Sequence, residues 1–323
     1  MKLVAWMAHH LESREIVDDY IRRITPLLAE HEFVVCESPE HALHEIEDAH
    51  VMIAWRITPE MFARARRLKW IQFGSAGIDH TTFPELLASD VILTTLGGIH
   101  AAPLAEHVLA VMLALNRRLD LAMRLQLQRR YDRSEIAATA DELAGKTLAI
   151  VGLGRIGLNV ARLAKAFGMR VIGTKRHPAA LQNVDRVMGP DDLRRMLPEA
   201  DFVVLVLPLT PGTSAMICRS EIESMKDGAR LINVARGAMV DHEALADALR
   251  NGKLAGAALD VFPEEPVAPD SPLYGLPNVI ITPHTAGSHP RYGERAAEIF
   301  RRNLEAFVAG TEMVNVYDRG RGY

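Results

Sequence analysis

The stretch Thr147–Pro178 reads TLAIVGLGRIGLNVARLAKAFGMRVIGTKRHP and contains the strongest local pattern of the chain. The apolar run at 147–152 predicts a buried strand, the apolar spacing over 158–168 predicts a helix, and 170–175 predicts a second strand. The turn between the first strand and the helix has the pattern GxGxxG. A strand, a glycine turn, a helix and a second strand in this order predict a βαβ unit of a parallel sheet.

The three glycines of this turn have separate physical roles. Gly152 permits the tight turn, Gly154 lets the backbone approach a pyrophosphate, and Gly157 lets the helix pack closely on the strand. The N–H groups at the start of the helix and the helix dipole then favour an anion. The turn, which includes Arg155 and Ile156, is therefore predicted to bind a dinucleotide. The alternative is a plain glycine-rich turn.

The end of the second strand bears on which dinucleotide binds. A site of this kind for NAD carries Asp or Glu here, which holds the ribose hydroxyls. This chain instead has Thr174, Lys175 and Arg176, a hydroxyl and two cations that suit the 2′-phosphate of NADP. Opposite charges ~4 Å apart are worth roughly 4 kcal/mol at an effective dielectric constant of ~20, and solvent exposure reduces this. Two alternatives stay open: the basic pair is a solvated loop, or Thr174 serves both cofactors.

Strand patterns lie on both sides of this unit. Buried apolar strands that alternate with helices indicate parallel sheets covered on both faces, which is an α/β fold of two doubly wound lobes. We expect one long connecting helix over 103–131, where neither glycine nor an internal proline occurs, and a last helix over 290–309 that returns to the first lobe. The expected strands lie at 2–7, 33–37, 51–55, 70–74 and 91–95, and then at 202–209, 229–235, 256–261 and 279–283.

The composition is that of an ordinary globular protein. The chain has 323 residues, of which 49% are hydrophobic and 24% charged, a length that favours two cores over one. A formal net charge of −4 gives no field that would attract nucleic acid or anionic membranes, and no signal segment or membrane span is predicted. The two cysteines, Cys36 and Cys218, agree with a reducing compartment. We expect a cytoplasmic protein without nucleic-acid or membrane partners, and we assign no metal ligands.

Several further motifs accompany the glycine turn. FGSAGIDH and PLAEHVLAVML precede it, and VLPLTPGT, LINVARGAMVDHEALADAL, AALDVFPEEP and ITPHTAG follow it in this order. Together they resemble the D-isomer-specific 2-hydroxyacid dehydrogenases, which include glyoxylate/hydroxypyruvate reductases and phosphoglycerate dehydrogenases. The resemblance runs from about Gly74 to Gly287. It implies a Rossmann cofactor domain at 99–287 inserted in a flavodoxin-like substrate domain at 1–98 plus 288–323, with the active site in the cleft.

The resemblance assigns three catalytic residues. Arg236 corresponds to the arginine that binds the substrate carboxylate and polarises the C2 carbonyl, a role suited to the planar fork of a guanidinium. His284 corresponds to the acid/base histidine, since imidazole exchanges protons near neutral pH. Glu265, and not Glu264, corresponds to the glutamate that orients this histidine and raises its pKa, because it directly precedes a proline.

The resemblance also implies a set of ligand contacts. Asp260 would contact the nicotinamide amide, with support of its own loop as the alternative. Backbone N–H groups of Ser75, Ala76 and Gly77 would bind the substrate carboxylate together with Arg236 and His284. The complete set of expected cofactor contacts is Gly152, Gly154, Arg155, Ile156, Gly157, Thr174, Lys175, Arg176, Leu207, Pro208, Thr213, Val234, Ala235, Asp260, His284 and Ala286.

The implied reaction is hydride transfer between NADP(H), or NAD(H) as the second choice, and C2 of a 2-keto or D-2-hydroxy acid. The family also implies a homodimer formed through the 103–131 region. Glu265 argues against a formate dehydrogenase, which has glutamine beside the histidine. A phosphite-type dehydrogenase and a dinucleotide-sensing protein like the C-terminal-binding corepressors remain alternatives. Substrate choice would depend on loops near 7–10, 55–56 and 75–78 and on the region after His284, and the sequence does not name the acid.

Overall fold

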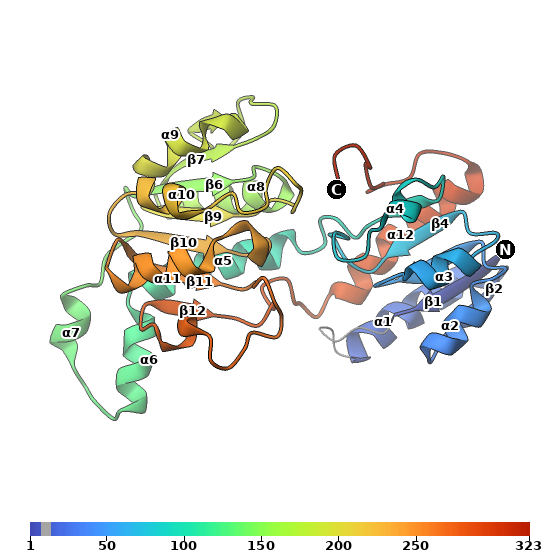
Figure 1. The fold of residues 1–323 in the computed structure, drawn as a ribbon, viewed down its shortest axis with the longest axis horizontal. Helices are drawn as coiled ribbons and strands as arrows, with labels where there is room; N and C mark the ends of the chain where they lie inside the picture. Colours follow the sequence, from blue (N-terminus) through green and yellow to red (C-terminus); the bar gives the residue numbers. More distant parts are fainter. Residues whose placement is uncertain (8–13) are drawn as a thin grey trace. The chain divides into compact units, whose positions relative to one another are not determined.

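The computed structural model describes residues 1–7 and 14–323, which form two compact units. The first unit combines Met1–His100 with Ser288–Tyr323, and the second is Ala101–Gly287 (Figure 1). Each unit is a parallel sheet with helices on its faces, so the predicted α/β fold with two doubly wound sheets is confirmed.

The first unit contains a five-stranded sheet with the order β2-β1-β3-β4-β5. This is the flavodoxin-like strand order, in which ligands bind beyond the carboxyl ends of the strands. The helix α12 packs against α1, so the C-terminal segment is part of this unit. The main elements are β1 (Lys2–Trp6), α1 (Arg14–Ile24), β2 (Glu32–Val35), α2 (Pro39–Glu45), β3 (Val51–Ala54), α3 (Pro59–Arg64), β4 (Trp70–Phe73), α4 (Pro84–Leu87), β5 (Ile92–Thr94) and α12 (Tyr292–Ala309).

Side chains of this sheet alternate between two hydrophobic cores. On β1, Leu3 and Ala5 join the core under α1 and α12, whereas Val4 joins the core on the opposite face. Every residue of β3 and β4 is buried, as expected for strands that are covered on both faces. Trp70 of β4 stacks on Phe300 of α12 with ring centroids 5.6 Å apart, which joins the C-terminal helix to the sheet.

The second unit contains a seven-stranded parallel sheet with the order β12-β11-β10-β9-β6-β7-β8. Counted from β6, this is the Rossmann order 3-2-1-4-5-6 with one more strand at the edge. The main elements are α5 (Ala101–Asn116), α6 (Leu119–Leu127), α7 (Arg133–Ala137), β6 (Thr147–Val151), α8 (Arg155–Ala166), β7 (Arg170–Thr174), β8 (Arg186–Met188), α9 (Leu193–Met196), β9 (Phe202–Leu205), α10 (Arg219–Ser224), β10 (Ala229–Asn233), α11 (His242–Arg250), β11 (Leu254–Leu259) and β12 (Val279–Ile281).

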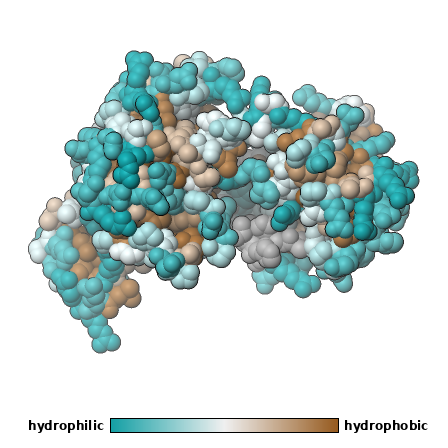
Figure 2. All heavy atoms as spheres, viewed as in Figure 1, coloured by the Kyte–Doolittle hydropathy of each residue, from teal (hydrophilic) through white to brown (hydrophobic). Residues whose placement is uncertain are grey.

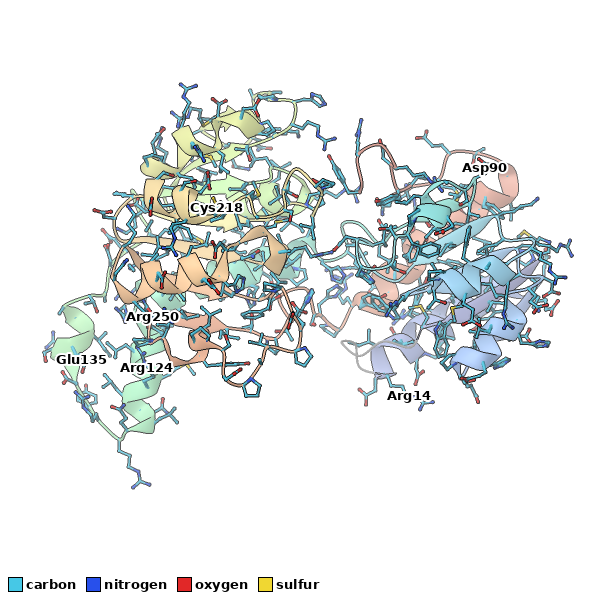
Figure 3. All side chains as sticks on the ribbon, viewed as in Figure 1. Arg14, Asp90, Arg124, Glu135, Cys218 and Arg250 are labelled. Carbon is cyan, nitrogen blue, oxygen red and sulfur yellow. The ribbon has the colours of Figure 1, made fainter. Side chains whose placement is uncertain are left out.

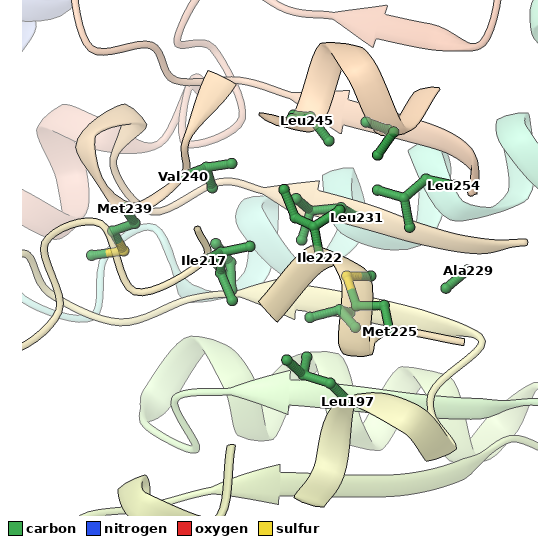
Figure 4. Close-up of a cluster of buried hydrophobic side chains, with 14 of the residues drawn as sticks. Leu197, Ile217, Ile222, Met225, Ala229, Leu231, Met239, Val240, Leu245 and Leu254 are labelled. Carbon is green, nitrogen blue, oxygen red and sulfur yellow. The ribbon is translucent and has the colours of Figure 1, made fainter. Parts of the chain in front are cut away.

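The core of this unit also lies on both faces of its sheet. Figure 4 shows one face, where Leu231 of β10 packs with Ile222 of α10 and Leu245 of α11. On β6, Ala149 and Val151 belong to this face, and Leu148 and Ile150 belong to the face under α5 and α8. The continuous apolar runs of the sequence therefore reflect strands that are buried on both sides.

The single helix predicted over 103–131 is wrong, because two helices occupy this region. The helix α5 ends at Asn116 and α6 begins at Leu119, and Arg118 between them has a left-handed backbone with φ 58°. Its guanidinium donates to both carboxylate oxygens of Asp120 at 3.2 and 3.1 Å, a contact that stabilises the turn.

The end of α5 is fixed by a contact from a distant part of the chain. The carbonyl of Asn116 accepts the N–H of Asp141 at 2.8 Å, so it needs no partner one turn further along a continued helix. The segment 103–131 contains neither glycine nor an internal proline, so no local helix-ending residue marks this break.

The predicted strands are confirmed, apart from shifts of a few residues at their ends. The short edge strand β8 and the short helix α7 were not predicted. Among the described residues, no helix combines the length and the apolar character needed to cross a membrane.

Candidate active site

The glycine turn follows β6 and leads directly into α8. Gly152 has a positive φ of 107°, which favours glycine. A Cβ at Gly157 would lie 2.2 Å from the carbonyl oxygen of Gly152, so the helix approaches the turn too closely for a larger residue. A Cβ at Gly154 would meet no protein atom within 4 Å, which leaves open space over the N-terminus of α8. The turn therefore has the shape of an anion cradle.

The three residues predicted to select the cofactor lie at the end of β7. The backbone of Thr174 accepts the N–H of Leu153 from the glycine turn at 2.8 Å, which places the two segments side by side. The backbone N–H of Lys175 donates to the carbonyl of Met188 at 2.9 Å. Thr174 is buried, Lys175 is half-buried and Arg176 is exposed.

Arg236 follows β10, the strand between β9 and β11 in the sheet. The side chain of Asn233 bonds to the backbone on both sides of this turn: its Oδ1 accepts the N–H of Ala235 at 3.0 Å, and its Nδ2 donates to the carbonyl of Arg236 at 2.9 Å. The Arg236 guanidinium donates to the carbonyl of Ala235 at 2.7 Å. The arginine thus lies on a turn that is fixed by a buried amide.

His284 and Glu265 form a close pair. Nδ1 of His284 lies 2.7 Å from Oε2 of Glu265, and Oε1 of Glu265 accepts the N–H of Phe262 at 2.9 Å. The side chains are 36% and 25% exposed, so the pair is accessible to a small molecule. His284 has a left-handed backbone with φ 54°, a strained conformation for a non-glycine residue that is often found at functional sites.

The two partners shift each other's pKa in opposite directions. The hydrogen bond to Glu265 raises the pKa of His284 above its ordinary value, and the charges of Glu265 and Asp260 add to this effect against partial burial and the charge of Arg236. Partial burial opposes ionisation of Glu265, but the bonds from His284 and Phe262 and the charge of Arg236 outweigh it, so the pKa of Glu265 is lowered. The pair therefore favours a carboxylate beside an imidazolium.

Asp260 binds the loop that carries His284. Its Oδ1 accepts hydrogen bonds from the hydroxyl of Thr282 at 2.5 Å and from the N–H of Thr285 at 2.9 Å. Its Oδ2 accepts a hydrogen bond from the N–H of Ala286 at 3.0 Å. Its own carbonyl accepts the N–H of His284 at 2.8 Å. The carboxylate is only 2% exposed and supports this loop, which was the alternative to a cofactor contact.

Further predicted cofactor contacts lie at other strand ends of the same unit. Thr213 stabilises the loop after β9, because its hydroxyl accepts the N–H of Thr210 and donates to the carbonyl of Pro208, both at 2.8 Å. The rest of the set is placed as follows: Leu207 is half-buried, Pro208 is exposed, and Val234, Ala235 and Ala286 are buried. The second unit thus brings the glycine turn, Thr174, Arg236, Glu265 and His284 to the carboxyl edge of one sheet.

The predicted carboxylate-binding loop, Ser75–Gly77, lies in the first unit after β4. Oγ of Ser75 donates to the carbonyl of Gly77 at 2.8 Å, which closes the loop on itself. The carbonyl of Gly74 accepts the hydroxyl of Tyr292 at 2.6 Å, so the first residue of α12 holds the start of the loop. Trp55 is buried and stacks on Tyr292.

The structure describes only part of the loops expected to determine substrate choice. Arg56 is exposed in the described structure. Residues 8–10 of the proposed specificity region lie outside the described residues.

Three residues that support the site were not predicted from the sequence. Asn233 and Tyr292 hold the two loops described above, and His107 of α5 lies with Nε2 3.4 Å from Oγ1 of Thr282. The position of Asn233, two residues before the turn with the predicted arginine, was the available signal. Tyr292 and His107 are distant in sequence from the loops they contact and gave none.

Comparisons with known proteins agree with these features. Residues 109–286 match the family model of the NAD binding domain of D-isomer specific 2-hydroxyacid dehydrogenases. D-3-phosphoglycerate dehydrogenase of Methanocaldococcus jannaschii is 36% identical over 283 residues, which are 86% of this chain but 53% of that protein, so the chain spans about half of its length. A glyoxylate reductase of Korarchaeum cryptofilum is 32% identical over 86% of this chain and 92% of its own length. The NADPH-dependent glyoxylate/hydroxypyruvate reductase of Sinorhizobium meliloti, solved with NADP and sulfate, is 25% identical with a TM-score of 0.85, and the match covers 100% of this chain and 99% of that one.

Proposed function

Because this chain belongs to the D-isomer-specific 2-hydroxyacid dehydrogenase family, we propose that it interconverts small 2-keto acids and D-2-hydroxy acids with NADP(H). The relatives make glyoxylate and hydroxypyruvate the first substrates to test. The main support is the contact of 2.7 Å between His284 and Glu265, with the charge of Arg236 acting on both. A histidine–carboxylate pair beside a guanidinium offers the proton and the anion-binding group that reduction of a 2-keto acid requires.

The glycine turn and the end of β7 fit a dinucleotide phosphate. The open space at Gly154 and the N-terminus of α8 would hold the pyrophosphate, and Thr174, Lys175 and Arg176 would contact the 2′-phosphate. When bound, the nicotinamide would supply or accept the hydride. The other proposed residues would contact the rest of the cofactor, from its adenosine to its nicotinamide: Arg155, Ile156, Leu207, Pro208, Thr213, Val234, Ala235, Asp260 and Ala286.

Arg236 and the Ser75–Gly77 loop would bind the substrate. The planar fork of the Arg236 guanidinium matches the two oxygens of a 2-keto acid, so it would bind the carboxylate and polarise the carbonyl. The backbone N–H groups of Ser75, Ala76 and Gly77 would bind the same carboxylate. Small side chains in this loop leave its backbone accessible.

His284 would move the proton. In reduction the imidazolium donates a proton to the carbonyl oxygen of the substrate, and in oxidation the neutral ring takes it back. Glu265 stabilises the protonated form, which agrees with the raised pKa of His284. Reduction is therefore expected to weaken as the pH rises through this pKa, and oxidation to weaken as the pH falls through it.

We propose a homodimer as the assembled state, with α6 contributing to the interface. Leu119, Met123 and Leu127 recur at every fourth position of α6 and are 50%, 67% and 85% exposed, and Tyr131 beyond the end of the helix is 100% exposed. Figure 2 shows hydrophobic atoms exposed over α6 among hydrophilic ones. An exposed apolar stripe of this kind is typical of a protein–protein contact.

The reaction is tested by initial-rate kinetics with NADPH and NADH side by side on 2-keto acids. The panel includes glyoxylate, hydroxypyruvate, pyruvate and phenylpyruvate, with phosphite as a substrate for oxidation. We expect turnover of at least one keto acid, with NADPH preferred. Turnover of phosphite alone would identify the phosphite-type alternative, and tight cofactor binding without turnover would support the dinucleotide-sensing alternative.

A further inference from the structure

We infer that Asn233 is a positioning residue for Arg236, an inference that rests on the proposed reaction. Asn233 is the last residue of β10 and is 0% exposed. Its amide bonds to two backbone groups of the following turn, the N–H of Ala235 at 3.0 Å and the carbonyl of Arg236 at 2.9 Å. One side chain thus brackets the dipeptide that carries the substrate-binding guanidinium.

The bracket fixes the backbone from which the guanidinium extends. Arg236 has an extended backbone with φ −148° and ψ 143°, and neither of its bracketing bonds is part of a helix or a sheet ladder. Because Ala235 is only 5% exposed, loss of the amide would leave its N–H without ready access to water. The backbone would then rotate to find other partners and would move the Arg236 side chain with it.

The same residue connects this turn to the strand beside it through its main chain. The carbonyl of Asn233 accepts the N–H of Asp260 at 3.0 Å, and the carbonyl of Asp260 accepts the N–H of His284 at 2.8 Å. These backbone bonds do not depend on the Asn233 side chain. A side-chain substitution is therefore expected to disturb Arg236 while the loop of His284 stays in place.

Both ends of the amide are required, because one accepts and the other donates. The asparagine amide carries its acceptor oxygen and its donor nitrogen on separate atoms, so it reaches both backbone groups at once. Aspartate has nearly the same shape and still accepts the N–H of Ala235, but it places a carboxylate oxygen against the carbonyl of Arg236. The substitution Asn233→Asp thus removes the donor alone, and Asn233→Ala removes both contacts.

The first test measures steady-state kinetics, cofactor binding and thermal unfolding for these variants and for the parent chain. We expect Asn233→Asp to lower kcat/KM for glyoxylate by about 10- to 100-fold, as misplacement of a positioning group by about 1 Å does. The Kd for NADPH, measured by fluorescence, should stay within about threefold because the glycine turn is unaffected. Unchanged kcat/KM in Asn233→Asp and Asn233→Ala would overturn the inference.

The control is Asn303→Asp, a matched change in the other unit. Asn303 is also 0% exposed, and its amide accepts the N–H of Val314 at 2.8 Å and donates to the carbonyl of Val314 at 3.2 Å and to Gln72 at 3.1 Å. Both changes are expected to lower the Tm, but only Asn233→Asp should lower kcat/KM strongly. An equal loss of kcat/KM in the control would mean that Asn233 has only a structural role.

A double-mutant cycle separates action through Arg236 from a general effect. The probe is oxamate, a 2-keto acid analogue, titrated into the enzyme with bound NADPH. We expect Asn233→Asp to weaken oxamate binding in the parent chain and to cause no further weakening in Arg236→Ala. Equal weakening in both backgrounds would contradict a role through Arg236. If the parent chain turns over no keto acid, the proposed function fails. If the parent chain is active and the Asn233 variants are equally active, only the inference about Asn233 fails.

Discussion

Glu265 places one carboxylate oxygen 2.7 Å from Nδ1 of His284, and its charge helps to keep the proton on the imidazole. Removal of this charge in Glu265→Gln should lower the pKa of His284, because the hydrogen bond and the charge that stabilise the protonated ring are weakened. Reduction requires the protonated ring, so the pH at which kcat/KM for keto-acid reduction begins to fall should move down. The measurement is kcat/KM for glyoxylate across pH.

The neighbouring Glu264→Gln is the matched control, because Glu264 is exposed and precedes the pair by one residue. Its pH profile should resemble that of the parent chain. A profile for Glu265→Gln that keeps the parent's pH limits would exclude Glu265 as the group that sets the proton affinity of His284.

Lys175 and Arg176 offer a second test at the scale of single residues. An exposed ion pair contributes up to about 1 kcal/mol, so alanine at both positions should lower kcat/KM with NADPH by roughly 10- to 30-fold. The value with NADH should change little, since NADH lacks the 2′-phosphate. Alanine at both Arg66 and Arg67, an exposed basic pair in the other unit, is the control. Equal losses with NADPH and NADH would show that the basic pair does not read the phosphate.

The proposed catalytic residues were assigned by resemblance, because Arg236, Glu265 and His284 lie in sequence motifs that resemble those of the family. The partners that hold them were harder to predict. Asn233 supports Arg236 through backbone groups, and the three bonds that Asp260 accepts from the 282–286 segment depend on how two strands end side by side. Such contacts arise from the fold rather than from spacing along the chain.

At the scale of the element, a substitution in the glycine turn can affect cofactor binding without affecting the stability of the fold. Gly154 has φ −92° and ψ −162°, which other residues adopt, and its Cβ would enter open space. We therefore expect Gly154→Ala to fold normally but to raise the Kd for NADPH about tenfold or more, because the methyl group occupies the space of the pyrophosphate. Thermal unfolding and a fluorescence titration measure the two effects separately.

Gly157→Ala is the contrasting change in the same turn. Alanine would favour the helix by about 1 kcal/mol, but its Cβ would lie 2.2 Å from a backbone oxygen, and overpacking of this kind costs about 1–3 kcal/mol or more. The variant should therefore have a lower Tm than Gly154→Ala. A Gly154→Ala chain that binds NADPH as the parent does would mean that the open space is not the phosphate site.

The helix pair α5 and α6 shows why element boundaries were less predictable than the elements themselves. The apolar spacing continues through the break, so periodicity alone gives one helix. The break results from Arg118, which adopts φ 58° and binds Asp120, and from Asp141, which caps Asn116 from 25 residues further along the sequence. Tertiary contacts of this kind override local helix propensity.

At the scale of the whole molecule, the two-sheet architecture was predictable because its signals repeat. Fully buried parallel strands produce continuous apolar runs, and both sheets contain such strands. Short elements at the sheet edge, such as β8, contribute too few buried residues to give a clear pattern. The assembly of two chains depends on exposed surfaces, and the dimer was expected only by resemblance.

The exposed stripe of α6 makes the proposed dimer testable. Leu127 and Met123 are 85% and 67% exposed and lie one turn apart on α6. The short helix α7 follows α6 in the chain (Figures 1 and 3, where Arg124 and Glu135 mark the two helices). A stable interface buries roughly 800 Å² per partner, so this stripe would be the apolar centre of a larger contact. Charges at its centre are expected to be strongly unfavourable when buried without partners.

We therefore expect the double variant Met123→Glu with Leu127→Glu to be monomeric at concentrations where the parent chain is dimeric. Light scattering coupled to size-exclusion chromatography measures the mass directly. Val308→Glu is the control, because Val308 is 61% exposed on α12 of the other unit and lies outside the stripe. Both variants place charge on exposed helical positions, so neither should lower the Tm of a monomer through lost packing. A Tm that falls only for the stripe variant would therefore reflect loss of the second subunit. A stripe variant that keeps the dimer mass would place the interface elsewhere, and a monomeric parent chain would remove the proposed assembly altogether.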